Sequence, residues 1–377
     1  MNLRRISSAL FNFDAHYPRT IIASVIFITV FFGWKAFKLD LNPGIRSGLP
    51  RDHEIVRSIE MVDSLFSGSD ILIVAVESDS LFSANTLNKM AIFQDSLQSL
   101  ELISKVTSIF NQKYIVPDKN GFSIEPLLVN IPNDSIGQQK LISRLKDSDV
   151  IGNLVSNDYK TLCFVGQINS SFEYDEFQFR KNIYELVDRF TDTEKFYVSS
   201  LPITRTTVIE YMQRDIRVFT PVALGLSTFL LMLSFKSWTG VFLPFFVVGF
   251  SIIWTFGVMG WLNISLSFIG TLIPVMLVAI ANNYGIHIIS HYFEYSKSDK
   301  QSTRGQILRK TIRKVGVPIL LAGLTTMISF LCLLSHTLPK VREMGLFVSF
   351  GILISFILSI ILIPSVLVLV NRPQHLQ

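Results

Sequence analysis

The sequence predicts a membrane bundle of six transmembrane helices with a large α+β domain between the first and second helices. Of its 377 residues, 49% are hydrophobic and only 17% are charged, which is more apolar than a typical soluble chain. Uncharged runs of about 20 residues recur, and this is the length that a helix needs to cross a bilayer. One stretch, residues 38–215, is instead as polar as a soluble domain. These contrasts predict the domain boundaries.

Six segments are long and apolar enough to span the membrane. The first covers residues 20–37, with Tyr17 and Trp34 near its ends as aromatic anchors at the membrane interface. No small-residue cleavage pattern follows it, so we expect a span rather than a removed signal peptide. The other five predicted spans cover residues 216–235, 238–262, 265–291, 315–334 and 344–370.

The short basic flanks of the spans predict the orientation, because cationic side chains are retained on the cytoplasmic side. The cations concentrate before the first span, at the second-to-third connection and at the fourth-to-fifth connection, three places on one side of the membrane. We therefore expect both termini in the cytoplasm, with residues 1–37 as N-terminus and first span and 372–377 as a tail. Residues 38–215 then lie outside the cytoplasm. The cations are Arg4, Arg5, Arg19, Lys236, Lys297, Lys300, Arg304, Arg309, Lys310, Arg313 and Lys314.

Within residues 216–371, the segment 301–314 carries a further pattern. It places Ile307, Leu308 and Ile312 on one helical face and its cations on the other. This is typical of an amphipathic helix that lies on the membrane surface. We expect an amphipathic cytoplasmic helix there.

The polar domain shows a strand, a helix and a strand, twice in series. The first unit covers residues 70–77, 83–99 and 103–110, with Ser83 as the expected N-cap of its helix. After an irregular insertion up to about residue 159, the second unit covers residues 161–168, 174–190 and 196–200. Two such units predict a ferredoxin-like fold with both helices on one face of the sheet.

No pattern for an enzyme is present. Ser199 and Ser200 lack the glycine-flanked turn of a nucleophile elbow, and His53 is the single histidine of the polar domain. The chain has no GxxxxGK[ST] loop for nucleotide hydrolysis. Cys163 and Cys332 fall in different regions, which predicts neither a disulfide framework nor a metal site. We expect no catalytic residues, no cofactor and no nucleic-acid partner, since basic residues and aromatics do not interleave.

The fourth span contains the most informative run, ANNYGIHIISHYFE at residues 281–294. Helical spacing places Asn283, His287 and either Ser290 or His291 on one stripe. In one interpretation, Asn282 and Asn283 join helices through hydrogen bonds. In the other, Asn283, Tyr284 and His287 line a pathway for protons or ions, because polar groups at this depth usually serve a function.

Two further patterns concern the fifth and sixth spans. Thr325, Thr326 and Ser329 are candidates for the same polar core, unless their hydroxyls bond back to their own helix. Gly351, Ser355 and Ser359 recur every four residues, as in closely packed membrane helices. We take this second stripe as support for a homo-oligomer.

The run at residues 281–294 resembles the fourth-helix motif of the resistance-nodulation-division (RND) superfamily. It resembles in particular the branch that contains the mycobacterial large membrane proteins and the hydrophobe and amphiphile exporters, where the motif usually reads G-x-G-V-D-Y-x-I-H. Residues 68–77, GSDILIVAVE, look like the first porter strand, and residues 201–215, LPITRTTVIEYMQRD, look like the lead into the second span. Residues 318–364 are similar to the fifth and sixth helices. The resemblance implies one repeat of six helices with an extracytoplasmic porter domain.

The sequence departs from this pattern in two ways. Such exporters commonly carry two repeats, whereas this sequence has one, so we expect a homodimer or higher oligomer, or a second, separately encoded half. Asn283 stands where the family usually has aspartate, and an amide does not release a proton. Either His287 carries the proton traffic, or the protein couples to sodium through amide and hydroxyl oxygens or handles lipid passively.

The resemblance implies an exporter of hydrophobic or amphiphilic molecules, with lipids as the expected substrate, in a bacterial or archaeal cytoplasmic membrane. One alternative is a non-pumping domain that senses lipid or sterol, and another is an accessory subunit of protein translocation. Dependence of export on the proton gradient would distinguish the exporter from the non-pumping sensor. Copurification with a secretion channel would favour the accessory translocation subunit.

Overall fold

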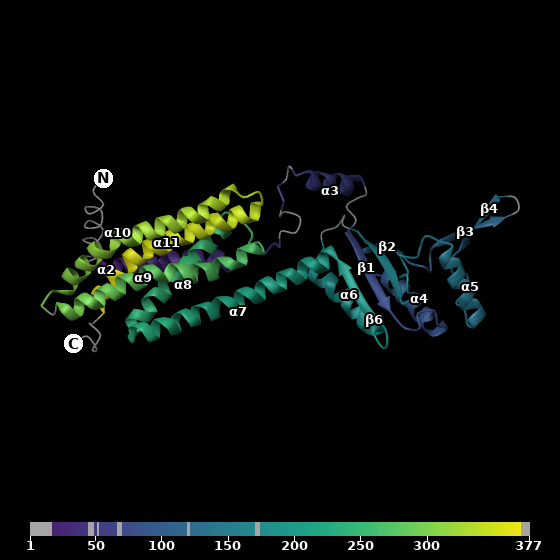
Figure 1. Cartoon of the computed structure of the whole chain (residues 1–377), viewed down its shortest axis with the longest axis horizontal. Helices are drawn as coiled ribbons and strands as arrows, with labels where there is room; N and C mark the ends of the chain where they lie inside the picture. Colours follow the sequence, from purple (N-terminus) through teal and green to yellow (C-terminus); the bar gives the residue numbers. More distant parts are fainter. Residues whose placement is uncertain are drawn as a thin grey trace. The chain divides into compact units, whose positions relative to one another are not determined.

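The computed structural model describes residues 17–43, 49–50, 53–65, 70–118, 121–169, 174–299 and 301–370. It divides into two compact units (Figure 1). The helical unit comprises residues 1–53 and 208–377, and the sheet unit comprises residues 54–207. The predicted N-terminal flank with Arg4 and Arg5 and the predicted tail 372–377 lie outside the described residues.

Six helices in the described part of the chain are long and apolar enough to cross a membrane, which confirms the predicted number of spans. Two short 3-10 helices accompany them: η1 (Ile269–Leu272) precedes the fourth membrane helix, and η2 (Cys332–Ser335) follows the fifth. The six helices are α2 (Pro18–Ala36), α7 (Leu201–Phe235), α8 (Trp238–Trp261), α9 (Ile273–Ser298), α10 (Arg304–Leu331) and α11 (Pro339–Leu369).

Two helices begin more than ten residues earlier than the sequence patterns predict. Helix α7 starts at Leu201 instead of residue 216, because the Ser200 hydroxyl accepts from the Ile203 amide at 3.2 Å and begins the helix directly after a strand. Helix α10 starts at Arg304 and continues to Leu331, so the amphipathic helix expected near residues 301–314 is the first part of this longer helix. A reciprocal capping box between Thr303 and Gln306 begins one continuous helix.

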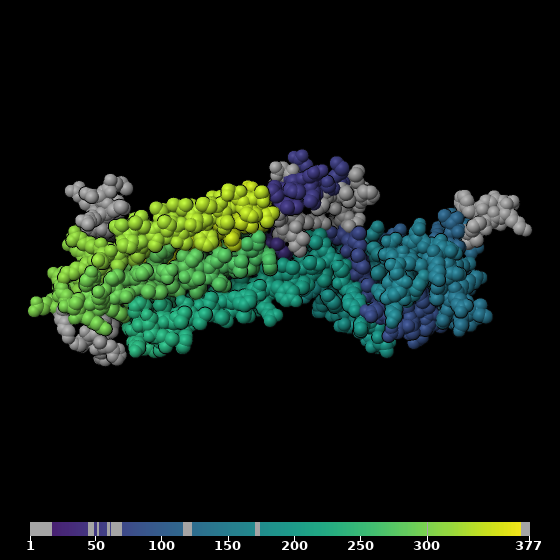
Figure 2. All heavy atoms as spheres, in the orientation of Figure 1, coloured from purple at the N-terminus to yellow at the C-terminus, as the bar shows by residue number. Residues whose placement is uncertain are grey.

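Helix α11 packs against α2, α8, α9 and α10 and forms the centre of the helical unit. Leu277 and Ile289 of α9 and Val348 and Ile363 of α11 are fully buried in this core. Residues 208–235 of α7, teal in Figure 2, form part of the outer surface of the helical unit. Much of that surface is apolar, for example at Phe229, as expected of a helix that faces lipid.

The small-residue stripe of α11 lies inside this bundle. Ser355 and Ser359 are fully buried, and the Ser355 hydroxyl donates to the Ala281 carbonyl at 3.5 Å. A Cβ atom on Gly351 would lie 2.7 Å from the Leu277 side chain. The stripe therefore packs helices of one chain, and its use as support for a homo-oligomer is wrong, because periodicity identifies a face but not its neighbour.

The sheet unit contains a four-stranded sheet in the order β2-β5-β1-β6, with all neighbours antiparallel. Helices α4 and α6 cover one face, where Phe93 of α4 makes edge contacts with Phe164 and Phe196. On the other face Ile73 and Tyr197 are exposed. The elements are α3 (Glu54–Leu65), β1 (Asp70–Glu77), α4 (Ala84–Gln98), β2 (Ile103–Thr107), β5 (Thr161–Ile168), α6 (Glu176–Phe190) and β6 (Lys195–Ser200).

The predicted N-cap is confirmed, since the Ser83 hydroxyl accepts from the Thr86 amide at 3.2 Å. The insertion before β5 is more regular than predicted. It contains a hairpin of β3 (Lys113–Asp118) and β4 (Gly121–Pro126), followed by α5 (Ser135–Lys146). Prolines within both strands conceal the hairpin in the sequence, because proline disfavours a strand interior.

Candidate functional site

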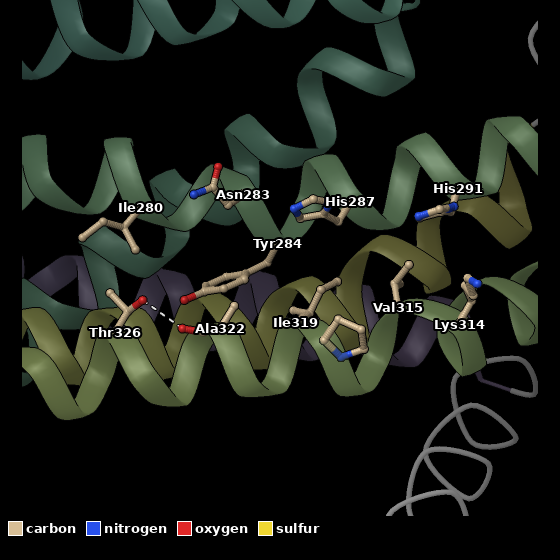
Figure 3. Close-up of a pocket in the computed structure, with 11 residues that line it drawn as sticks. Ile280, Asn283, Tyr284, His287, His291, Lys314, Val315, Ile319, Ala322 and Thr326 are labelled. Atoms are coloured by element: carbon tan, nitrogen blue, oxygen red, sulfur yellow. Dashed lines mark hydrogen bonds between the residues drawn. The ribbon is translucent and has the colours of Figure 1, made fainter.

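A cavity of about 560 Å³ lies between α9 and α10 (Figure 3). It brings together several polar residues of the informative run with polar residues of the next helix. The polar lining is Asn283, Tyr284, His287 and His291 from α9 and Lys314 and Thr326 from α10. The apolar lining is Ile280, Val315, Pro318, Ile319 and Ala322.

The connection between the two helices sets their antiparallel alignment. Asp299 accepts from the Ser302 amide at 3.1 Å and from the Ser302 hydroxyl at 2.7 Å, and it pairs with Lys310 of α10. The hydrogen bonds from Lys310 and Ser302 lower the pKa of Asp299 to about 2, so the carboxylate stays charged. This anchored turn places His291 and Lys314 at the same end of the cavity (Figure 3).

Tyr284 points from α9 toward α10 and is the most buried polar residue of the lining (Figure 3). Its ring meets Phe356 of α11 edge-on, with centroids 6.1 Å apart. A Cβ atom on Gly323 would lie 3.3 Å from the Tyr284 hydroxyl, so glycine provides the space for the phenol. The hydroxyl has no hydrogen-bond partner among the described residues, a situation that is uncommon in structural cores and warrants a functional explanation.

Asn283 and His287 line the cavity but are exposed at the surface of the helical unit. Ser290, one turn further along α9, is also exposed. The predicted stripe is therefore present, and it faces outward from this single chain. Polar side chains at this position in a membrane helix need a protein or aqueous neighbour.

Asn282 does not reach the cavity. Its amide nitrogen donates to the Ser227 hydroxyl of α7 and to the Val278 carbonyl, the latter at 3.0 Å. Its amide oxygen is buried without a partner in the part of the chain that the structure describes. Asn282 thus joins two helices, as the first interpretation expects, while Asn283 and its neighbours line a space.

The three hydroxyls of α10 are bonded back to their own helix. Thr325 and Thr326 both donate to the Ala322 carbonyl, at 3.0 and 2.8 Å, and Ser329 donates to the Thr325 carbonyl at 2.9 Å. Of the three, Thr326 lines the cavity. This is the arrangement that the alternative interpretation predicted.

The sequence patterns did not predict that His291 and Lys314 line one space. Their meeting depends on the antiparallel pairing of α9 and α10, whereas the sequence places Lys314 in the basic segment at residues 301–314 and His291 in the fourth span. The His291 Nδ1 atom lies 2.8 Å from a carboxylate oxygen of Glu294. Among the described residues no carboxylate lines the cavity, and the ionisable groups of this described lining are two imidazoles, one phenol and one amine. The short connection was the available signal, since it forces the two helices to run side by side.

Comparison with known proteins gives two matches. The model of the MMPL family matches residues 47–376. A protein of Methanocaldococcus jannaschii named "Putative membrane protein MJ1562" is 21% identical over 385 residues, covering 98% of this chain and 95% of that protein. The family match includes the sheet unit and five of the six candidate membrane helices.

Proposed function

This chain belongs to the MMPL family, and from that premise we propose that it exports hydrophobic or amphiphilic molecules, with lipids as the substrate class. The MMPL family is a family of transporters within the RND superfamily and not a family of enzymes. Six candidate membrane helices and a matched M. jannaschii membrane protein agree with a multi-pass membrane protein. Export from the cytoplasmic membrane is our proposal.

The observation that carries the proposal is the cavity between α9 and α10. It combines an unpartnered phenol, two imidazoles and an amine with an apolar wall. A helix that only packed in lipid would not be expected to collect these groups, because polar side chains in spans carry a free-energy penalty. The cavity suits a pathway for protons or a polar headgroup next to apolar substrate.

We assign the sheet unit as a porter domain outside the cytoplasm. The strand order β2-β5-β1-β6, with α4 and α6 as the crossovers, is the order of a ferredoxin-like split βαβ fold. The cations Lys236, Arg309, Arg313 and Lys314 lie in or near two helix connections on one side of the membrane, which supports cytoplasmic termini.

We further propose that two copies, or this chain and a separately encoded half, pair along α9. Asn283, His287 and Ser290 are exposed along one side of this helix. A facing protein surface would keep these polar groups from the acyl chains. The exposed polar residues of α9, and not the buried small residues of α11, support this pairing.

The proposed coupling group is His287. Asn283 does not titrate, and an imidazole changes charge near neutral pH. We expect His287→Ala to abolish export while expression and membrane insertion stay at wild-type levels, measured as appearance of labelled lipid outside cells. Ser290→Ala is the matched control, since Ser290 lies on the same exposed side of α9 without lining the cavity. Wild-type export by the His287 variant would reject the coupling role.

One observation favours a second candidate, a lipid-sensing domain that does not pump. The cavity has amide and imidazole groups but no carboxylate in its lining, so the usual proton carrier of the resembling exporters is missing. In that case lipid binding would persist, but collapse of the proton gradient with an uncoupler would leave lipid distribution unchanged.

A further inference from the structure

The end of the cavity next to the α9–α10 connection is positively charged. Lys314 lines this end and forms no ion pair with any described residue. Two carboxylates near this end of the helices, Glu294 of α9 and Asp299 of the connection, have other partners. Glu294 lies against His291, and Asp299 pairs with Lys310. The Lys314 charge is therefore left available to a ligand.

The rest of the cavity is apolar along one side. Val315, Ile319 and Ala322 of α10 follow Lys314 at helical spacing and lead to Thr326. Twelve residues separate Lys314 from Thr326, which corresponds to about 18 Å along a helix. The lining thus offers one cationic end and a long apolar wall, a combination that matches a molecule with an anionic headgroup and a hydrocarbon chain.

We propose that this cavity binds an anionic amphiphile, with its phosphate or carboxylate group at Lys314 and His291 and its hydrocarbon chain along Ile319 and Ala322. The Lys314 ammonium supplies the charge, and the His291 ring, which lies 2.8 Å from Glu294 through Nδ1, adds a polar contact. The inference rests on the proposed function in one respect: it names the substrate class for the same site.

The alternative for Lys314 is that it extends to the aqueous interface and binds nothing specific, as lysines at the ends of spans often do. Arg309 provides the matched control. It lies on the same helix within the same basic segment and is exposed, but it does not line the cavity. A diffuse attraction of anionic lipid to the surface would depend on both cations equally.

The test is direct binding to the full-length protein in phosphatidylcholine nanodiscs, with phosphatidylglycerol, oleate and inorganic phosphate as separate probes. We expect Lys314→Gln to weaken binding of phosphatidylglycerol or oleate by at least about fivefold, as for the loss of one cationic contact. Arg309→Gln should change it by less than about twofold. Ala322→Trp, which fills the apolar wall and keeps Lys314, should also abolish binding.

Three results would overturn the inference. These are unchanged binding in the Lys314 variant, an equal loss in the Arg309 variant, or binding of inorganic phosphate as tight as that of the amphiphiles. The first two results would show that Lys314 is not part of a specific binding site. The third would show that the apolar wall does not contribute to the binding affinity. Binding can be measured without transport. If the wild-type protein binds the amphiphiles through Lys314 but exports no lipid, the proposed function is rejected and this inference stands. Normal export without such binding would reject only this inference.

Discussion

The Tyr284 side chain has one part that stabilises the fold and one part that does not. Its ring is packed against Phe356 and contributes to the core, whereas its hydroxyl is buried beside the cavity without a partner among the described residues. An unsatisfied buried hydroxyl destabilises a fold by about 1–3 kcal/mol. The hydroxyl points toward α10, on the side of Ala322 and Thr326 (Figure 3), and we infer that it acts in the cavity.

Replacing Tyr284 by phenylalanine tests whether the hydroxyl serves stability or export. We expect Tyr284→Phe to leave the unfolding midpoint unchanged or slightly raised, because the ring remains and the unpaired hydroxyl is removed. Export should fall at least about tenfold if the hydroxyl relays a proton or holds a headgroup. Thermal unfolding in detergent and the cellular export assay measure the two effects. A large loss of stability with normal export per folded molecule would show that the hydroxyl is only structural.

At the scale of helices, close approach between α2 and α8 depends on glycine. A Cβ atom on Gly257 would lie 2.6 Å from the Phe32 carbonyl oxygen, which is backbone and has little freedom to move. We expect Gly257→Ala to lower the free energy of unfolding by about 1–3 kcal/mol through this clash. Gly249→Ala, in the same helix with open space around it, should be neutral or stabilise by up to about 1 kcal/mol. Unfolding in mixed micelles compares the two, and similar losses would contradict the packing.

In the sheet unit, Lys89 of α4 pairs with Glu194 at 2.8 Å and with Asp192 at 2.7 Å. Burial acts to raise the pKa of Glu194, but the hydrogen bond from Lys89, the Lys89 charge and hydrogen bonds from the backbone together outweigh it, and the pKa lies below its ordinary value. The pair therefore stabilises the fold above about pH 4.3, the value for an unfolded chain. That contribution is lost as the pH falls through the lower folded value.

We expect Glu194→Gln to destabilise the sheet unit by about 1–3 kcal/mol at pH 7, with a smaller difference near pH 3. Hydrogen exchange of α4 and β6 in the full-length protein measures this. Glu125→Gln is the control. The Glu125 side chain, which pairs with Arg144, is 43% exposed, so this pair should contribute about 1 kcal/mol or less to the free energy of unfolding. Equal effects at pH 7 and pH 3 would contradict the ionic role of Glu194.

These elements also show what the sequence could predict. The six helices were predictable because continuous apolar runs identify spans without knowledge of neighbours. The start of α10 was readable from Thr303 and Gln306, which carry a capping-box signal. The neighbour of the Gly351 stripe and the meeting of Lys314 with His291 were not readable, because helical periodicity defines faces and only the tertiary arrangement pairs them.

For the whole molecule, the exposed polar side of α9 leads to a prediction about assembly. We expect Ser290→Cys to form cross-linked dimers in native membranes, because the proposed pairing brings two copies of α9 together. Phe229→Cys is the control, since this α7 residue is 58% exposed and apolar and should face lipid. Non-reducing electrophoresis distinguishes the two. Cross-linking of Phe229→Cys but not of Ser290→Cys would place the interface elsewhere.

The measurement that tests the central claim most directly is lipid efflux from proteoliposomes with an imposed pH gradient. The account predicts that the gradient accelerates efflux by the wild-type protein and by Ser290→Ala, and that His287→Ala removes the acceleration. Efflux that is independent of the gradient, or a gradient response that survives His287→Ala, would contradict coupling through the α9–α10 cavity.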